Sequence, residues 1–83
     1  MNKNNNSLAK KIHCIGIGGI GISAIARWHQ EHGVIISGSD STDSALLSNL
    51  RDTGMDIWLG IQPEKIDPTI DHIIYTEAII TKP

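Results

Sequence analysis

Three glycines at fixed spacing, Gly16, Gly18 and Gly21, constrain the fold of this chain more than any other feature of its sequence. In a G-x-G-x-x-G loop the first glycine permits a tight turn, the second lets the backbone approach a diphosphate, and the third lets a helix pack closely on a strand. An apolar run at residues 12–15 precedes the loop, and residues with helical periodicity follow it. This setting predicts a strand-loop-helix unit that binds a phosphate group; a purely structural glycine turn is the alternative. A fourth glycine, Gly19, removes one more side chain from the loop.

A first helix is predicted from about residue 20 to residue 32. Gly33 follows at the position of a C-terminal glycine cap, where a left-handed backbone conformation is needed. Apolar side chains recur at helical spacing and predict the face that packs on the sheet. These residues are Ile20, Ala24, Ile25 and Trp28.

The rest of the chain predicts alternating strands and short helices. Strands are expected at residues 11–15, 34–37, 56–59 and 72–76, the second of them covered on both faces. A second helix ends at Gly54, and Pro63 and Pro68 leave room for at most one helical turn between residues 60 and 70. Its expected N-cap oxygens come from Ser41, Thr42 and Asp43, and its expected buried stripe consists of Ala45, Leu46, Leu47 and Leu50.

This order of elements predicts an α/β fold, a Rossmann-like doubly wound parallel sheet of about four strands in a single small domain. Residues 11–83 are expected to form that domain, after a flexible N-terminal tail at residues 1–10. A sheet of four strands leaves an edge, so a homodimer paired through that edge is a possible assembly.

Composition excludes several classes of partner. The net charge of −2 and the absence of a basic patch argue against a nucleic-acid partner. No apolar run approaches the roughly 20 residues that cross a bilayer, and no signal peptide is recognisable, so a cytoplasmic protein without a membrane partner is expected. The single cysteine, Cys14, lies in a predicted strand and is expected to be a small core residue.

Asp40 is the strongest candidate for a polar contact with a nucleotide. It follows the last glycine of the loop at close to the spacing of about 20 residues at which an acidic side chain meets ribose hydroxyls in dinucleotide folds. The alternative is that Asp40 only caps the second helix or shapes its turn.

The sequence offers no catalytic machinery. It contains neither a nucleophile motif nor a G-x-x-x-x-G-K-[ST] phosphate loop. The four histidines, His13, His29, His32 and His72, do not have the spacing of a metal site. We therefore expect no catalytic residue and no metal ligand, and we expect Trp28 and Trp58 to be packing residues.

Two segments together carry a more specific resemblance. Residues 13–23 read HCIGIGGIGIS and residues 37–40 read SGSD. This combination closely resembles the N-terminal domain of the Mur ligases, in particular the alanine-adding branch of that family. The resemblance extends over most of the chain, with two differences: Glu77 stands where the family usually has serine, and Ile61 where this branch usually has histidine.

The resemblance implies that the domain binds UDP-N-acetylmuramate rather than NAD. The backbone of residues 18–21 would hold the diphosphate, Asp40 with Ser39 and Ser41 would meet the uridine, and the segment from Thr76 would border the diphosphate or sugar. The full set of implied contact residues is Gly16, Gly18, Gly19, Ile20, Gly21, Ser39, Asp40, Ser41, Thr76, Ala78 and Ile79.

In such ligases a central domain uses ATP and Mg to activate the muramyl carboxylate, and a C-terminal domain helps to present the amino acid for peptidoglycan synthesis. Neither is recognisable in these 83 residues, so we expect a fragment that is inactive as a ligase. Two further hypotheses stay open at this point: a stand-alone sensor of NAD or adenine nucleotides, and a dimeric interaction module.

Overall fold

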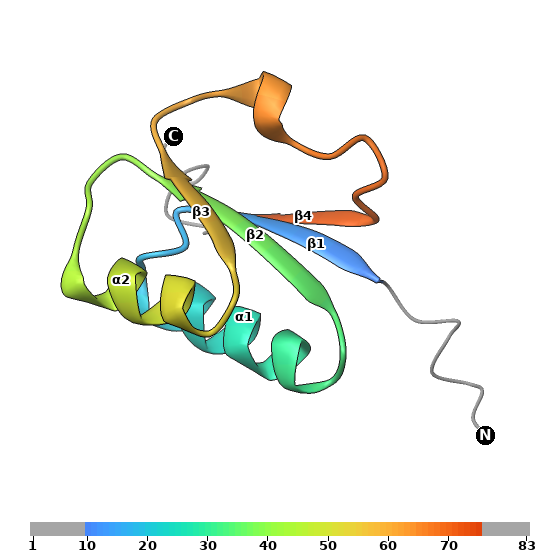
Figure 1. Ribbon diagram of the computed structural model, residues 1–83, viewed down its shortest axis with the longest axis horizontal. Coiled ribbons are helices and arrows are strands. Elements are labelled where there is room, and N and C mark those ends of the chain that lie inside the picture. Colours follow the sequence, from blue (N-terminus) through green and yellow to red (C-terminus); the bar gives the residue numbers. More distant parts are fainter. Residues whose placement is uncertain (1–9, 76–83) are drawn as a thin grey trace, which may run out of the picture.

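Four parallel strands lie side by side in the computed structural model, which describes residues 10–75 (Figure 1). Their order in the sheet is β3-β2-β1-β4. The elements along the chain are β1 (Lys11–Ile15), α1 (Ile20–Glu31), β2 (Ile35–Asp40), α2 (Ala45–Asp52), β3 (Asp56–Leu59), the 3-10 turn η2 (Pro63–Lys65) and β4 (His72–Tyr75). The predicted Rossmann-like α/β class is confirmed.

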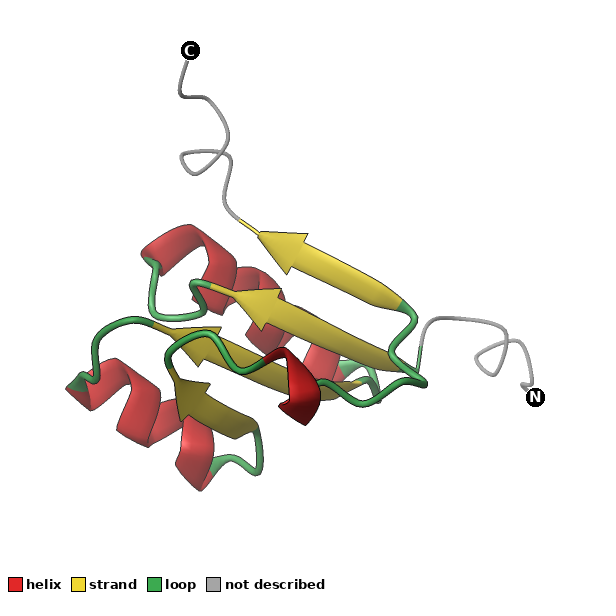
Figure 2. Ribbon diagram, turned by 90° about the horizontal axis from the view of Figure 1, so that it is seen from above, coloured by secondary structure: helices red, strands yellow, loops and turns green. Residues whose placement is uncertain are grey.

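After β3 the chain crosses back to the other edge of the sheet, where it adds β4. From β1 to β2 to β3 each new strand is added on the same side, and right-handed connections place α1 and α2 on one face (Figure 1). The connection from β3 to β4 returns past β2 and β1 and carries η2 over the opposite face, and the four arrowheads in Figure 2 point the same way. The strand order therefore switches between β1 and β4, beside the region where such sheets bind ligands.

The core lies between the sheet and the two helices. Ile12 and Cys14 of β1 are fully buried in one cluster with Leu47 and Leu50 of α2. Burial raises the pKa of the Cys14 thiol to about 11, so the thiol is neutral and behaves as a small apolar side chain. The prediction that Cys14 is a core residue is confirmed.

The buried face of α1 is not the predicted one. Ile20 is 87% exposed and Trp28 is 56% exposed, and the side chains that pack on the sheet are Ile22, Ser23 and Ala26. The predicted stripe of Ile20, Ala24, Ile25 and Trp28 is exposed throughout. Small residues at 23 and 26 let the helix backbone approach the strands closely, and the Ser23 hydroxyl is satisfied because it donates to the Ile20 carbonyl at 3.0 Å. Close packing of small side chains thus outweighs the larger apolar residues of the neighbouring face.

The helix ends agree with the sequence in part. Gly33 has a φ of +91° and ends α1 as predicted. The N-cap of α2 is Ser44, whose hydroxyl accepts from the Leu47 amide at 3.2 Å, so the expectation that residues 41–43 cap this helix is wrong. In the predicted stripe of α2, Leu47 and Leu50 are buried, Leu46 is partly buried and Ala45 is exposed. Neither helix in the described region is long and apolar enough to cross a membrane.

The face of the sheet opposite the helices is only partly covered. The connection that carries η2 lies over this face (Figure 1), and the buried Trp58 of β3 lines a cavity together with Pro63 of η2. Ile35 of β2 is 63% exposed, and Ile73 and Tyr75 of β4 are half exposed. The expectation that the second strand is covered on both faces is therefore wrong, because within residues 10–75 neither α1 nor α2 packs on this side and the connection that carries η2 leaves Ile35 exposed.

The glycine pattern predicts that a helix packs closely on a strand at Gly21. The close contact occurs instead at Gly38 of β2. A Cβ atom added at Gly21 would meet no atom within 4 Å. At Gly38 of β2 it would lie 2.5 Å from Cδ1 and 2.9 Å from Cβ of Ile17, a fully buried side chain. Ile17 therefore fills the space over β2 that a side chain at position 38 would need.

We predict that Gly38→Ala lowers the free energy of unfolding by about 1 to 3 kcal/mol, the usual cost of overpacking a core. The added methyl group would push the buried Ile17 side chain away from β2. Chemical denaturation followed by circular dichroism measures the change.

Gly21→Ala is the matched control, because the same methyl group meets open space there. It should leave stability unchanged or raise it by up to about 1 kcal/mol, since alanine favours a helix over glycine. Equal losses in the two variants would contradict the packing role assigned to Gly38.

Candidate functional site

A pocket of about 210 Å³ lies beyond the carboxyl ends of β1, β2 and β3. It contains four residues that the sequence analysis selected, Gly16, Ser39, Asp40 and Ser41. The remaining lining residues are Ile15, Gly60 and Ile61, which come from the end of β1 and the loop after β3. We call this cavity the strand-end pocket.

The glycine loop is tied to the end of β2 by its backbone. Gly16 has a φ of +77°, the conformation that a tight turn needs and that glycine adopts readily. The amides of Gly16 and Ile17 both donate to the Ser39 carbonyl, at 2.8 and 3.1 Å, and the Gly19 amide donates back to the Gly16 carbonyl at 3.0 Å. The tight-turn role predicted for the first glycine is confirmed.

Asp40 binds the glycine loop directly. Its Oδ2 accepts from the Gly18 amide at 2.8 Å, and its Oδ1 accepts from the Thr42 amide at 3.3 Å. A Cβ atom at Gly18 would lie 2.8 Å from that same Oδ2, so the absence of a side chain at Gly18 makes room for the carboxylate. Asp40 therefore holds the loop and shapes the following turn, and it does not cap α2, because Ser44 does.

The start of α1 presents backbone amides with no partner in the helix. The helix begins at Ile20, and its N-cap residue Gly19 has no side chain that could accept from them. The first turn has no acidic side chain, and Gly19, Ile20 and Gly21 are exposed. A helix N-terminus carries about half a positive charge, so this exposed turn suits a phosphate group without help from lysine or arginine.

A buried histidine lies beneath the strand-end pocket, on the face of the sheet opposite the helices. His13 is 1% exposed, and its Nδ1 lies 2.8 Å from Oγ of Ser37. Its Nε2 lies 3.4 Å from Oγ of Ser39, and its ring stacks on Trp58 with 5.0 Å between centroids. Burial lowers the pKa of His13, with Asp56 opposing, so the imidazole is neutral at neutral pH.

Sequence reasoning found no role for His13. The available signal was its register: His13 pairs with Ser37 across β1 and β2, and Ser39, two residues further, projects from the same face.

The remaining predicted contact residues fall outside the described region. Thr76, Ala78 and Ile79 follow the last described residue, as does Glu77. Tyr75, at the end of β4, pairs with Ile15 beside the strand-end pocket.

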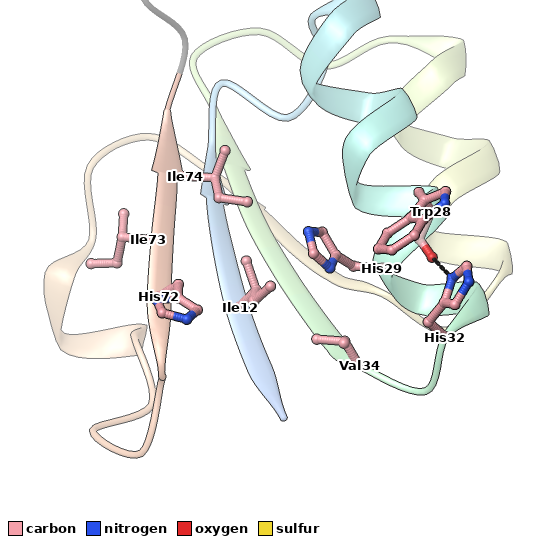
Figure 3. Close-up of a pocket in the computed structure, with 8 residues that line it drawn as sticks. All are labelled: Ile12, Trp28, His29, His32, Val34, His72, Ile73 and Ile74. Atoms are coloured by element: carbon pink, nitrogen blue, oxygen red, sulfur yellow. Dashed lines mark hydrogen bonds between the residues drawn. The ribbon is translucent and has the colours of Figure 1, made fainter. Parts of the chain in front are cut away.

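A larger cavity, of about 490 Å³, lies between the C-terminal half of α1 and strands β1 and β4, away from the glycine loop (Figure 3). Trp28 stacks on His32 there with 3.9 Å between ring centroids, and Nδ1 of His32 lies 2.7 Å from the Trp28 carbonyl. The lining residues are Ile12, Trp28, His29, His32, Val34, His72, Ile73 and Ile74. Within residues 10–75 no group of three or more His, Cys, Asp or Glu side chains is placed to hold a metal ion, this cavity included.

The family model that matches this chain and the proteins similar to it in sequence agree with each other. The model of the family described as "Mur ligase family, catalytic domain" matches residues 11–82. The chain is similar to UDP-N-acetylmuramate–L-alanine ligases: 49% identical over 70 residues to that of Alkaliphilus metalliredigens, 49% over 70 to that of Campylobacter curvus, and 46% over 70 to that of Clostridium beijerinckii. Each alignment covers 84% of this chain but only 15 to 16% of the relative, so the chain spans about one sixth of the length of these ligases.

We predict that Asp40→Ala lowers the free energy of unfolding by about 1 to 2 kcal/mol, because the Gly18 amide loses a charged acceptor. Exchange of the Gly18 amide proton with solvent should accelerate as well, which NMR measures residue by residue.

Asp43→Ala serves as the control. Asp43 is an exposed carboxylate that follows the partly buried Asp40 by three residues, and it binds the Ser44 amide and Arg51 rather than the glycine loop. Unchanged Gly18 exchange in Asp40→Ala would show that the carboxylate does not hold the loop.

Proposed function

The chain belongs to the Mur ligase family, and we propose that it is the UDP-N-acetylmuramate-binding, N-terminal part of a ligase that adds L-alanine in peptidoglycan synthesis. The observation that carries the proposal is the position of the strand-end pocket directly beside the exposed amides at the start of α1. A nucleoside diphosphate needs both features, a pocket with polar groups for the nucleoside and N–H donors for the phosphates.

The proposed division places the diphosphate over residues 19–21 and the uridine in the strand-end pocket. Helix amides and the helix dipole stabilise the phosphate charge, and the absence of an acidic side chain in the first turn avoids repulsion. Gly18 contributes differently from the expectation, because its amide already donates to Asp40. The second glycine of the motif thus organises the loop. The Gly19 amide likewise donates to the Gly16 carbonyl, so the donors proposed to face the phosphates are the amides of Ile20 and Gly21 in the first turn of α1.

Asp40 keeps capacity for the nucleoside while it holds the loop. Each carboxylate oxygen has two acceptor sites, and only one bond to each is made within the described residues. Ser39 and Ser41 flank it on the pocket lining and supply hydroxyl groups. We assign the uracil or ribose donors of the ligand to this group, and the border of the diphosphate or sugar to Thr76, Ala78 and Ile79.

The proposed role is to hold a substrate rather than to transform it. Among the described residues, those that line the strand-end pocket include no histidine, lysine or cysteine that could act as a base or nucleophile. ATP and Mg would be bound by other parts of a ligase, and the site of action would be the cytoplasm. The 83-residue chain alone should therefore show no ATP turnover with UDP-N-acetylmuramate and L-alanine. The similarity to ligases over most of the chain does not favour the alternative of an NAD or adenine-nucleotide sensor.

We predict that isothermal titration calorimetry detects one UDP-N-acetylmuramate per chain and no response to NADH. Ser41→Ala should weaken the binding of the UDP-sugar by about three- to tenfold, as expected for one lost hydrogen bond.

Ser48→Ala is the matched control, since Ser48 is exposed on α2 and does not line the strand-end pocket. It should bind as the unsubstituted chain does. NADH binding without any response to UDP-N-acetylmuramate would contradict the proposed function.

A further inference from the structure

His13 connects two serines of the neighbouring strand on one face of the sheet. Ser37 and Ser39 alternate with Gly38 along β2, so both project toward the face on which His13 lies. The imidazole reaches Ser37 through Nδ1 at 2.8 Å and Ser39 through Nε2 at 3.4 Å. Each ring nitrogen therefore has one serine as its partner.

The ring itself is held in place from two sides. Its plane lies 18° from that of Trp58, against which it stacks. The Lys65 ammonium lies 5.8 Å from the centre of the Trp58 ring, so η2 contributes a cation to the same stack. The short bond to Ser37 then fixes the rotation of the ring, and Nε2 is left in a defined position toward Ser39.

Ser39 is the member of this group that reaches the ligand site. It lines the strand-end pocket, which Ser37 and His13 do not. It also lines a third cavity, of about 220 Å³, together with His13 and Trp58. Of the three residues, Ser39 alone lines both the strand-end pocket and the cavity that His13 borders, and its hydroxyl lies 3.4 Å from Nε2 of His13.

A serine hydroxyl rotates about its Cβ–Oγ bond, so a binding site that uses it must fix its direction. A neutral imidazole donates through one nitrogen and accepts through the other, so Ser37 and Ser39 take opposite roles in their bonds to His13. In the tautomer whose Nε2 accepts, the Ser39 O–H points at His13 before any ligand arrives and its oxygen stays available to a ligand donor, which lowers the ordering cost of binding.

We propose that His13 is a positioning residue for substrate binding: through Nε2 it fixes the Ser39 hydroxyl at the strand-end pocket for a hydrogen bond with the uridine part of a UDP-sugar. The inference rests on the proposed function, and it adds a buried residue that touches no ligand.

Two substitutions of His13 separate positioning from packing. In His13→Asn the amide ends near the Nδ1 position and keeps a partner for Ser37 only, whereas in His13→Gln the side chain extends far enough to reach Ser39. With UDP-N-acetylmuramate in calorimetry, His13→Asn should weaken binding about five- to tenfold, the same loss as Ser39→Ala. His13→Gln should stay within about twofold of the unsubstituted chain.

The double variant His13→Asn with Ser39→Ala measures the energetic coupling between the two residues in ligand binding. If His13 acts through Ser39, the double variant loses no more than Ser39→Ala alone, since the two changes remove one interaction. A second readout needs no folded His13 variant. In the ¹⁵N NMR spectrum of the ligand-free chain, Ser39→Ala should shift the Nε2 resonance of His13, and Ser37→Ala should shift Nδ1.

Binding by His13→Asn equal to that of the unsubstituted chain, or an Nε2 resonance unmoved by Ser39→Ala, would overturn the role of His13 and leave the proposed function standing. Failure of the unsubstituted chain to bind UDP-N-acetylmuramate would overturn the proposed function and, with it, the role of His13 in binding.

Discussion

The bond between the Asp40 carboxylate and the Gly18 amide connects the sheet to the glycine loop, and the geometry of the candidate site depends on it. A glycine loop has few side-chain contacts of its own, so without such a bond it would sample many conformations. Here one side chain at the end of β2 and the Ser39 carbonyl beside it accept three loop amides. The first turn of α1 is consequently presented in one orientation, next to the strand-end pocket.

In the structure, different residues anchor the loop and present amides to a phosphate, whereas the glycine pattern alone assigns both roles to the same loop. Gly16 and Gly18 shape and anchor the loop, and the Gly19 amide closes it onto the Gly16 carbonyl, whereas Ile20 and Gly21 place amides without a helix partner at the start of α1. Beneath them, on the opposite face of the sheet, His13 and its two serine partners extend the polar structure into the interior. A substrate-holding domain benefits from such rigidity, because groups that are already oriented lose less conformational entropy when a ligand binds.

The strands and their succession along the chain could be predicted from the sequence, because β-branched runs and glycine caps are local signals. The buried face of α1 could not: periodicity favoured Ile20 and Trp28, but contact with the sheet is made where Ser23 and Ala26 permit close approach. The spacing of Asp40 predicted its place at the site, yet its partner, an amide of the loop, depends on how two strand ends meet. Thr76, Ala78 and Ile79 lie outside the described residues and stay predictions.

Mapping UDP-N-acetylmuramate onto the chain by amide chemical-shift changes in NMR tests the central claim most directly, because it distinguishes the strand-end pocket from the larger cavity between α1 and β4. We predict that the amide resonances of Gly19, Gly21, Ser41 and Gly60 shift on titration. Those of residues that line the larger cavity, such as His72, should not shift. Chemical-shift changes confined to residues that line the larger cavity between α1 and β4, with the amide resonances of the glycine loop unchanged, would contradict the placement of the nucleotide at the strand ends.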